Sequence, residues 1–269
     1  MRLTSACCLL AAAVCAVPAG EPAADGWTGP ASAWTLTGST PIAVAVAVVE
    51  VPAGIGPSTE ARLTVAGGGA PVTATQALRP GRHELRAVVG AGATAACAIG
   101  LSWSRTMVLP APDGRTVAAR VLRVALEPVA AAPSGWSADA DIVATGGPIG
   151  LGAGWQPLET WQGDRFRWIG GTVELALAAA GSAGTATLTL DAEPGPGTGG
   201  RPARLAIADR HGRQIDVVEV AGRQRADLLI PAAALAEQPL RLRVLNGGAA
   251  TTGDPRILDL RVLRLTWTP

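Results

Sequence analysis

The sequence predicts an all-β protein built from two tandem, homologous antiparallel β-sandwiches of jelly-roll or immunoglobulin-like type. Three observations support this prediction: short apolar segments with a two-residue period, turn-forming residues between them, and an internal duplication. The composition agrees, because the 269 residues include 34 Gly and 21 Pro and 48% of them are hydrophobic. That apolar fraction excludes a disordered chain, and the scattered Gly, Pro and Val argue against a helical bundle.

Alternating apolar residues mark the expected strands. The clearest segments with this period are 42–48, 173–177, 186–190 and 240–244. A two-residue period places one face of each strand in a core. Glycine-rich turns separate the strands, for example at 67–69 and 193–200. Short strands at regular spacing with turns of this kind favour a β-sandwich.

The last strand of each half changes phase part-way along. Val262 and Leu263 are consecutive apolar residues where the alternation would place only one, and Val121 and Leu122 repeat the irregularity in the first half. We therefore expect a β-bulge in both strands. Elsewhere, residues 231–237 suit one short helix or a turn.

The internal duplication rests on anchors that recur in the same order along the chain. Residues 113–124 recur at 254–265, and residues 61–66 recur at 203–208. Further matched pairs are Gly81-Arg82 with Gly222-Arg223, Trp27 with Trp155, Trp34 with Trp168, Arg62 with Arg204, and Arg120 with Arg261. We therefore expect two homologous domains over 26–130 and 154–269, each of ordinary size for one domain. Residues 131–153 are rich in Gly, Ala, Pro and Ser and are interpreted as a linker.

The first 20 residues have the features of a secretory signal peptide. Arg2 supplies the positive start, residues 6–17 are largely apolar, and Ala19 ends a small-residue cleavage site. A transmembrane helix needs about 20 apolar residues, and Pro18 interrupts this segment. An uncleaved anchor is the less favoured alternative. Cleavage near Ala19 would give a secreted or periplasmic protein without a membrane span.

Loss of the signal peptide also changes the cysteines and the charge. Cys7, Cys8 and Cys15 would leave with it, and Cys97, in an apolar segment, is expected to be a buried small residue. No intramolecular disulfide could then form. Removal of Arg2 leaves 21 basic and 21 acidic residues. A balanced charge excludes the basic surface that is typical of nucleic-acid-binding proteins.

The second half carries an ordered set of motifs, which are GWxPLE at 154–159, FRW at 166–168, GR at 222–223 and DPRxLxxRV ending at 262. This set resembles a β-sandwich module of bacterial envelope proteins that is also appended to glycosyltransferases. The resemblance covers 154–269, while the first half keeps only parts of the pattern. It implies a β-sandwich fold and an accessory role in glycan binding or assembly, and it brings no catalytic residues.

Two charged pairs occur at equivalent places in the duplication. Asp113 and Arg115 precede the last strand of the first half, and Asp254 and Arg256 precede that of the second. We interpret them as structural pairs that close the last strand, because charges taken out of water need a partner. The alternative is a carboxylate–guanidinium site that grips a ligand.

The sequence offers no convincing catalytic or metal site. Glu159 and Asp164 flank Trp161 and would have to converge on one bond to act as a glycosidase pair, which their spacing does not establish. His83 and His211 stand apart from each other and supply too few ligands for zinc. Two carboxylates at 139 and 141 are likewise too few for calcium. We therefore expect no enzymatic activity, no metal and no cofactor.

Tryptophan is the remaining signal, with eight residues against one Phe and no Tyr. The other tryptophans fall in matched or apolar segments or in the expected linker, whereas Trp161 lies between Glu159, Asp164 and Arg165. Sugars bind on aromatic faces because their C–H surfaces suit an amphipathic ring. Trp161, Glu159, Asp164 and Arg165 are therefore the candidate ligand-binding residues.

The sequence thus favours a non-catalytic carbohydrate-binding or glycan-assembly accessory protein. The alternative is a structural or partner-binding protein of the cell envelope without a sugar site. The expected partner is accordingly a polysaccharide or an envelope protein. The sequence specifies neither the ligand nor the oligomeric state.

Overall fold

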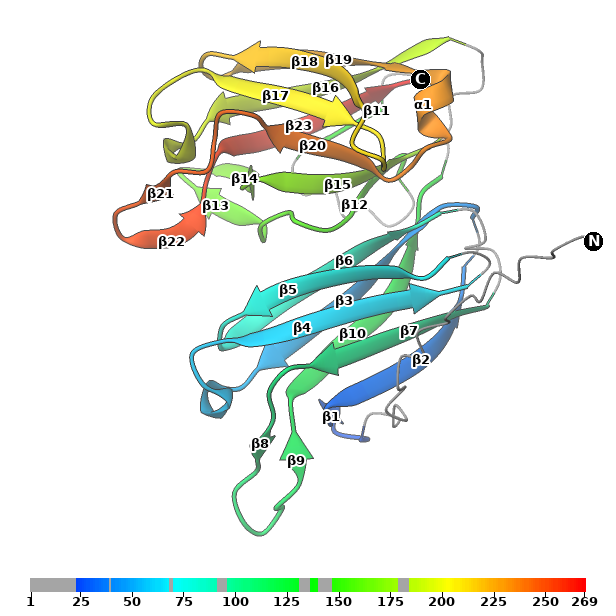
Figure 1. The fold of residues 1–269 in the computed structure, drawn as a ribbon, viewed down its shortest axis with the longest axis vertical. Helices are drawn as coiled ribbons and strands as arrows, with labels where there is room; N and C mark the ends of the chain where they lie inside the picture. Colours follow the sequence, from blue (N-terminus) through cyan, green and yellow to red (C-terminus); the bar gives the residue numbers. More distant parts are fainter. Residues whose placement is uncertain are drawn as a thin grey trace, which may run out of the picture.

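The computed structural model describes residues 23–269 except for 39, 68–69, 91–95, 131–135, 140–146 and 179–183. These residues form two antiparallel β-sandwiches, the first below the second in Figure 1. The predicted fold class is confirmed. The expected signal peptide, its cleavage site at Ala19 and the carboxylate at position 141 lie outside the described residues. No helix among the described residues is long and apolar enough to span a membrane.

The first sandwich is formed by two four-stranded sheets. One sheet contains, in spatial order, β1 (Trp27–Thr28), β10 (Ala119–Pro128), β3 (Ala43–Val51) and β6 (Gly81–Val89). The other contains β2 (Ala31–Thr37), β7 (Ala96–Trp103), β4 (Thr59–Ala66) and β5 (Val72–Leu78). A short 3-10 turn follows β3, and a hairpin of β8 (Met107–Val108) and β9 (Thr116–Val117) projects from one end (Figure 1).

The second sandwich repeats this arrangement. One sheet contains, in spatial order, β14 (Asp164–Ile169), β23 (Leu260–Thr268), β16 (Thr185–Pro194) and β19 (Gln224–Pro231). The other contains β15 (Thr172–Leu177), β20 (Leu240–Val244), β17 (Ala203–Ala208) and β18 (Gln214–Val220). The hairpin of β21 (Ala250–Thr251) and β22 (Asp254–Ile257) corresponds to β8–β9. The predicted short helix is α1 (Ala232–Leu235).

Strand order identifies the type of sandwich. Counting the eight matching strands of either unit along the chain, one sheet has the order 1-8-3-6 and the other has the order 2-7-4-5. Successive strands therefore cross between the sheets, which is the topology of a jelly roll. The immunoglobulin-like alternative is excluded.

The expected linker is partly folded into the second sandwich. Of residues 131–153, β11 (Trp136–Asp139) pairs with β23, and β12 (Ile149–Leu151) pairs with β15. A third added strand, β13 (Glu159–Trp161), pairs with β14. The composition was misleading because two glycines of this segment, Gly150 and Gly152, allow close packing rather than flexibility. A Cβ on Gly150 would lie 2.6 Å from Val44 and 2.7 Å from Val129, both in the first sandwich.

The two terminal strands contain the predicted bulges. The pairing of β10 with β3 shifts between Val121 and Arg123, which leaves Leu122 unmatched. The pairing of β23 with β16 shifts so that Val262 and Arg264 face consecutive residues and Leu263 is unmatched. Both bulges are confirmed, at equivalent positions of the duplication.

The strand register corrects two of the tryptophan matches. Trp27 lies opposite Arg120 on β10, and Trp168 lies opposite Arg261 on β23. Trp27 therefore corresponds to Trp168, and the match with Trp155 was wrong. Trp34 was wrongly matched to Trp168, because it lies in β2, in the opposite sheet of the sandwich. Sequence matching failed here because it followed the Gly-Trp motif, whereas the offset of 141 residues that joins Arg120 to Arg261 also joins Trp27 to Trp168.

Each sandwich has its own core. Cys97 is fully buried in the first, as predicted, and Trp267 is 1% exposed in the second. A smaller apolar cluster joins the two units, where Val44, Val46 and Val88 of the first pack against Ala176 and Ala178 of the second. The sandwiches are therefore held together by a buried contact between sheet faces.

Candidate functional site

The hairpin of β13 and β14 carries the candidate ligand-binding residues at an edge of the second sandwich. Trp161 pairs with Asp164 across a two-residue turn in which Gln162 and Gly163 have φ angles of 51° and 87°. Positive φ at both turn residues is the geometry of a type I′ hairpin, whose twist matches that of the strands. The turn thus fixes Trp161 at the end of the hairpin.

Trp161 lies at the surface and contacts a cation. Its side chain is 55% exposed, and the Arg261 guanidinium carbon lies 5.6 Å from the centroid of its ring. The same guanidinium lies 4.9 Å from the centroid of Phe166 and forms an ion pair with Glu193. Cation–π contacts of this length hold the indole in place. We refer to Trp161, Phe166, Arg261 and Glu193 as the Trp161 platform.

Asp164 lies beside the platform and is already paired. Arg223 donates hydrogen bonds to its two carboxylate oxygens over 2.7 and 3.2 Å. These bonds hold the pKa of Asp164 below its ordinary value. A bidentate pair of this kind presents both donors and acceptors to a ligand at its open edge.

The other two candidates are placed differently. Glu159 shares the strand face of Trp161, because the two are separated by one residue of β13, but its carboxylate is bound to Arg256. Arg165 is exposed and alternates with Asp164 and Phe166 along β14, so it belongs to the opposite face of the hairpin. The structure therefore unites three of the four candidates on one face and separates Arg165 from them.

Both predicted charged pairs are formed. Arg115 Nε donates to Asp113 over 2.6 Å, and Arg256 Nη2 donates to Asp254 over 2.7 Å. Each arginine also binds an acidic residue that precedes the first of the eight matching strands, Asp25 before β1 in one copy and Glu159 before β14 in the other. The Arg256 side chain lowers the pKa of Asp254 to about 2 by hydrogen bonding.

The expectation that these pairs are buried was wrong. The Asp254 and Arg256 side chains are 32% and 35% exposed, and the pair of the first copy is at least as open. The reason is that each pair lies on a projecting hairpin or its turn, outside the sandwich core. Side chains that are about one-third exposed keep their charges hydrated, so neither pair consists of charges buried away from water.

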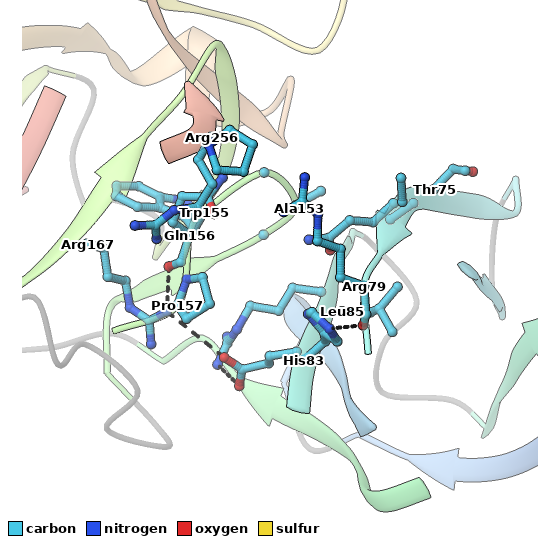
Figure 2. Close-up of a pocket in the computed structure, with 18 of the residues that line it drawn as sticks. Thr75, Arg79, His83, Leu85, Ala153, Trp155, Gln156, Pro157, Arg167 and Arg256 are labelled. Atoms are coloured by element: carbon cyan, nitrogen blue, oxygen red, sulfur yellow. Dashed lines mark hydrogen bonds and ion pairs between the residues drawn. The ribbon is translucent and has the colours of Figure 1, made fainter. Parts of the chain in front are cut away.

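A cavity of about 610 Å³ between the two sandwiches is a second candidate site. Figure 2 shows Arg79 and His83 of the first sandwich across from Trp155, Gln156 and Arg256 of the second. His83 Nε2 lies 2.6 Å from the carbonyl oxygen of Arg79. Sequence reasoning missed this cavity because its lining comes from both sandwiches, from residues such as Arg79 and Trp155 that lie far apart in the sequence.

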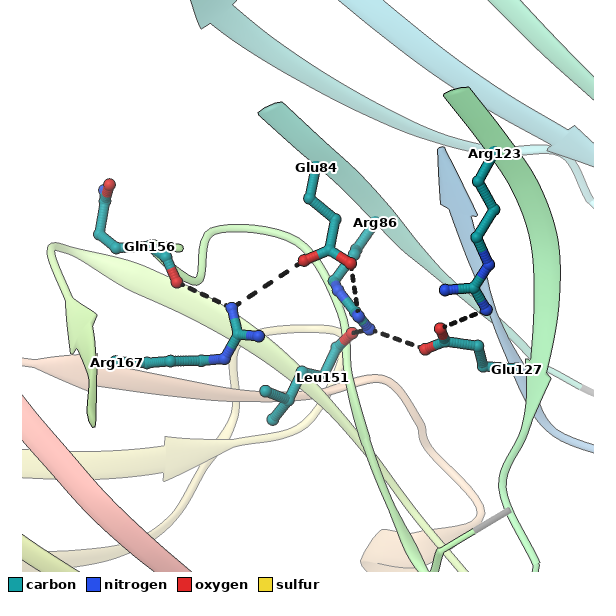
Figure 3. A network of polar contacts seen from close by, with 7 residues as sticks. All are labelled: Glu84, Arg86, Arg123, Glu127, Leu151, Gln156 and Arg167. Atoms are coloured by element: carbon teal, nitrogen blue, oxygen red, sulfur yellow. Dashed lines mark hydrogen bonds and ion pairs between the residues drawn. The ribbon is translucent and has the colours of Figure 1, made fainter. Parts of the chain in front are cut away.

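A network of charged side chains lies beside the cavity (Figure 3). Arg86 Nη2 donates to Glu84 over 2.8 Å, and Arg86 Nη1 donates to Glu127 over 3.1 Å. Arg86 also donates to the carbonyl oxygen of Leu151, in the second sandwich. Arg167 donates to the carbonyl of Gln156 over 3.1 Å and lies 4.0 Å from the Glu84 carboxylate. The network therefore joins the two sandwiches.

Comparisons with known proteins were made for the whole chain. No family model matches the sequence, and no curated protein matches it. Among solved structures, the CBM22-1–CBM22-2 tandem domain of Xyn10C from Paenibacillus barcinonensis is similar, at 14% identity and a TM-score of 0.31, over 93% of this chain and 84% of that one.

Two larger proteins are similar at a lower level. A Paenibacillus xanthan lyase matches at 9% identity and a TM-score of 0.26, and the M60 region of Clostridium perfringens ZmpB with two CBM51 domains matches at 10% and 0.21. These matches span 88% and 87% of this chain but only 22% and 33% of the two larger proteins. Similarity at this level assigns neither a ligand nor an activity.

Proposed function

We propose that the protein is a non-catalytic carbohydrate-binding accessory protein that acts outside the cytoplasm and binds glycans at the Trp161 platform. The observation that carries this proposal is the 55% exposed indole of Trp161, fixed by a tight hairpin and by the Arg261 guanidinium. A large exposed aromatic ring held in one orientation suits the C–H face of a sugar ring. Ordering before binding also lowers the entropic cost of association.

Polar groups around the ring suit the hydroxyls of a sugar. The Asp164–Arg223 pair and the Arg261–Glu193 pair together offer carboxylate acceptors and guanidinium donors. The two candidate carboxylates, Glu159 and Asp164, are engaged by arginines, and the lowered pKa of Asp164 keeps it ionised near neutral pH. An ionised, paired carboxylate is unsuited to general-acid catalysis, which supports a binding role.

The test compares two exposed apolar side chains. Trp161→Ala and Leu229→Ala remove side chains that are 55% and 53% exposed, the second on β19 at the far edge of the same sheet. Wild-type protein is screened on a glycan array, and the strongest glycan is titrated by calorimetry. We expect Trp161→Ala to weaken binding by about 2 kcal/mol or more, with Leu229→Ala unchanged. Equal binding by both variants, or no glycan bound by wild type, would contradict the proposal.

A further inference from the structure

The cavity between the sandwiches has the size and lining of a ligand site. Its volume of about 610 Å³ lies within the roughly 300–1,000 Å³ that is usual for small-molecule pockets. One wall is formed by the end of β5 and the start of β6, and the other by residues 152–157 and β22. Binding sites often occur at such boundaries between domains.

The walls are fixed by hydrogen bonds that do not involve a ligand. Trp155 Nε1 donates to the carbonyl of Glu174 over 2.9 Å, which orients the indole in the wall. Arg167 holds the carbonyl of Gln156, and Arg86 holds that of Leu151. The cavity is therefore formed before anything binds, which lowers the entropic cost of binding.

The charges around the cavity leave one cation unmatched. Arg86 is paired with Glu84 and Glu127, and Arg256 is paired with Asp254 and Glu159. Arg167 faces Glu84 at 4.0 Å. Within the part of the chain that the structure describes, no carboxylate lies within ion-pair distance of Arg79, whose charge reaches Asp254 only as a weak influence on its pKa.

We infer that this cavity binds a uronic-acid unit of an acidic glycan, with the carboxylate of the sugar at Arg79. A guanidinium presents parallel N–H donors that match a carboxylate. One unmatched positive charge suits a singly charged carboxylate better than a doubly charged phosphate. Trp155 and Pro157 supply apolar wall for the sugar ring, and Gln156 supplies polar groups for its hydroxyls.

The inference rests on the proposed glycan-binding function and names the class of glycan. Arg256 lines the cavity and binds Glu159, and Glu159 lies two residues before Trp161 on the same face of β13. Two residues of a strand span about 7 Å. A glycan chain that leaves the cavity past Arg256 therefore meets the Trp161 platform.

The experiment uses trimers of galacturonate, glucuronate and mannuronate, each with its methyl ester as the uncharged control. Calorimetric titration of the full mature chain should show at least one acid trimer binding about tenfold or more tightly than its ester, as expected for a charge-assisted contact. Arg79→Gln should abolish this preference. Arg82→Gln, three residues later at the start of β6 and outside the cavity lining, should keep it.

Trp161→Ala separates this inference from the proposed function. If Trp161→Ala lowers affinity for acid and ester alike while the preference for the acid persists, both sites are supported. If no acid trimer binds more tightly than its ester, or if Arg79→Gln retains the preference, the cavity inference is overturned. Neutral glycan binding that depends on Trp161 would leave the proposed function standing in that case.

Discussion

Arg120 and Arg261 occupy the same position in the two copies of the jelly roll, but their surroundings have diverged. Arg120 is flanked by Trp27 and Glu50 on neighbouring strands, and Arg261 by Trp168 and Glu193. Arg120 is exposed, whereas Arg261 is 9% exposed.

The added strand β13 accounts for the difference. It brings Trp161 over the Arg261 guanidinium, and the described residues of the first sandwich contain no strand at the corresponding edge of β1. The second copy therefore carries an aromatic surface on a scaffold that both copies share. This explains why the candidate platform is found in one half of a duplicated protein.

The first prediction compares these two arginines. Arg261→Ala removes an ion pair with Glu193 and the cation between two aromatic rings. We expect the free energy of unfolding of the second sandwich to fall by about 2–3 kcal/mol, from the charged hydrogen bond and the cation–π contacts. Arg120→Ala, at an exposed position, should change the free energy of unfolding of the first sandwich by about 0.5 kcal/mol or less. Urea denaturation of both variants measures this difference, and equal losses would contradict it.

The second prediction concerns the charged network between the sandwiches. Arg86 is 5% exposed, and Arg86→Ala leaves the Glu84 and Glu127 carboxylates without their shared partner. Removing one member of a buried ion pair costs about 3–5 kcal/mol when the other charge is left alone, and the cost here should be lower because Glu127 keeps its ion pair with Arg123. We expect calorimetry to show a clear destabilisation of the first sandwich and weaker coupling to the second.

The control for this network is an open ion pair in the same sandwich. Arg62 lies 3.5 Å from Glu60, and both side chains are about half exposed. Exposed pairs contribute about 0–1 kcal/mol, so Arg62→Ala should leave the transition nearly unchanged. If Arg86→Ala were as mild as Arg62→Ala, the network would not hold the sandwiches together.

Local patterns in the sequence predicted the fold well. Alternation marked the strands, and the consecutive apolar residues at Leu122 and Leu263 marked two bulges, because burial of one strand face leaves its period in the chain. The duplication predicted two sandwiches for the same reason, because matched apolar residues of the two halves are buried in the cores of their own sandwiches.

The candidate sites were predictable only in part. An aromatic residue in a polar segment identified Trp161, but its contact with Arg261 and the contact of the neighbouring Asp164 with Arg223 join residues that lie far apart in the sequence. The cavity depends on contacts between the two sandwiches. Glycines such as Gly150 look alike in a sequence whether they form a flexible linker or a close packing contact.

The third prediction follows from the hydrogen bonds to Asp254. The pKa of its carboxyl falls from an ordinary 3.8 to about 2 in the folded protein. A lowered folded-state pKa stabilises the fold above the unfolded-state value, and most of the contribution is lost as the pH falls from about 4 to 2. Asp254→Asn should therefore lower the melting temperature by a small amount at neutral pH and by much less near pH 2. A difference that persists unchanged at pH 2 would contradict this origin.

The last prediction tests the contact between the two sandwiches. A Cβ at Gly150 would approach Val44 and Val129 of the first sandwich to 2.6 and 2.7 Å, closer than packed atoms tolerate. Gly150→Ala should therefore force the sheet faces apart and cost about 1–3 kcal/mol, as overpacking usually does. Gly222→Ala is the matched control, because a Cβ there meets nothing within 4 Å.

Calorimetry and small-angle scattering of the two variants measure stability and the separation of the sandwiches. Because the cavity lies at this boundary, Gly150→Ala should also weaken any binding that depends on Arg79, whereas binding at Trp161 should persist. An unchanged separation and unchanged stability in Gly150→Ala would show that the two sandwiches are not held by this packing.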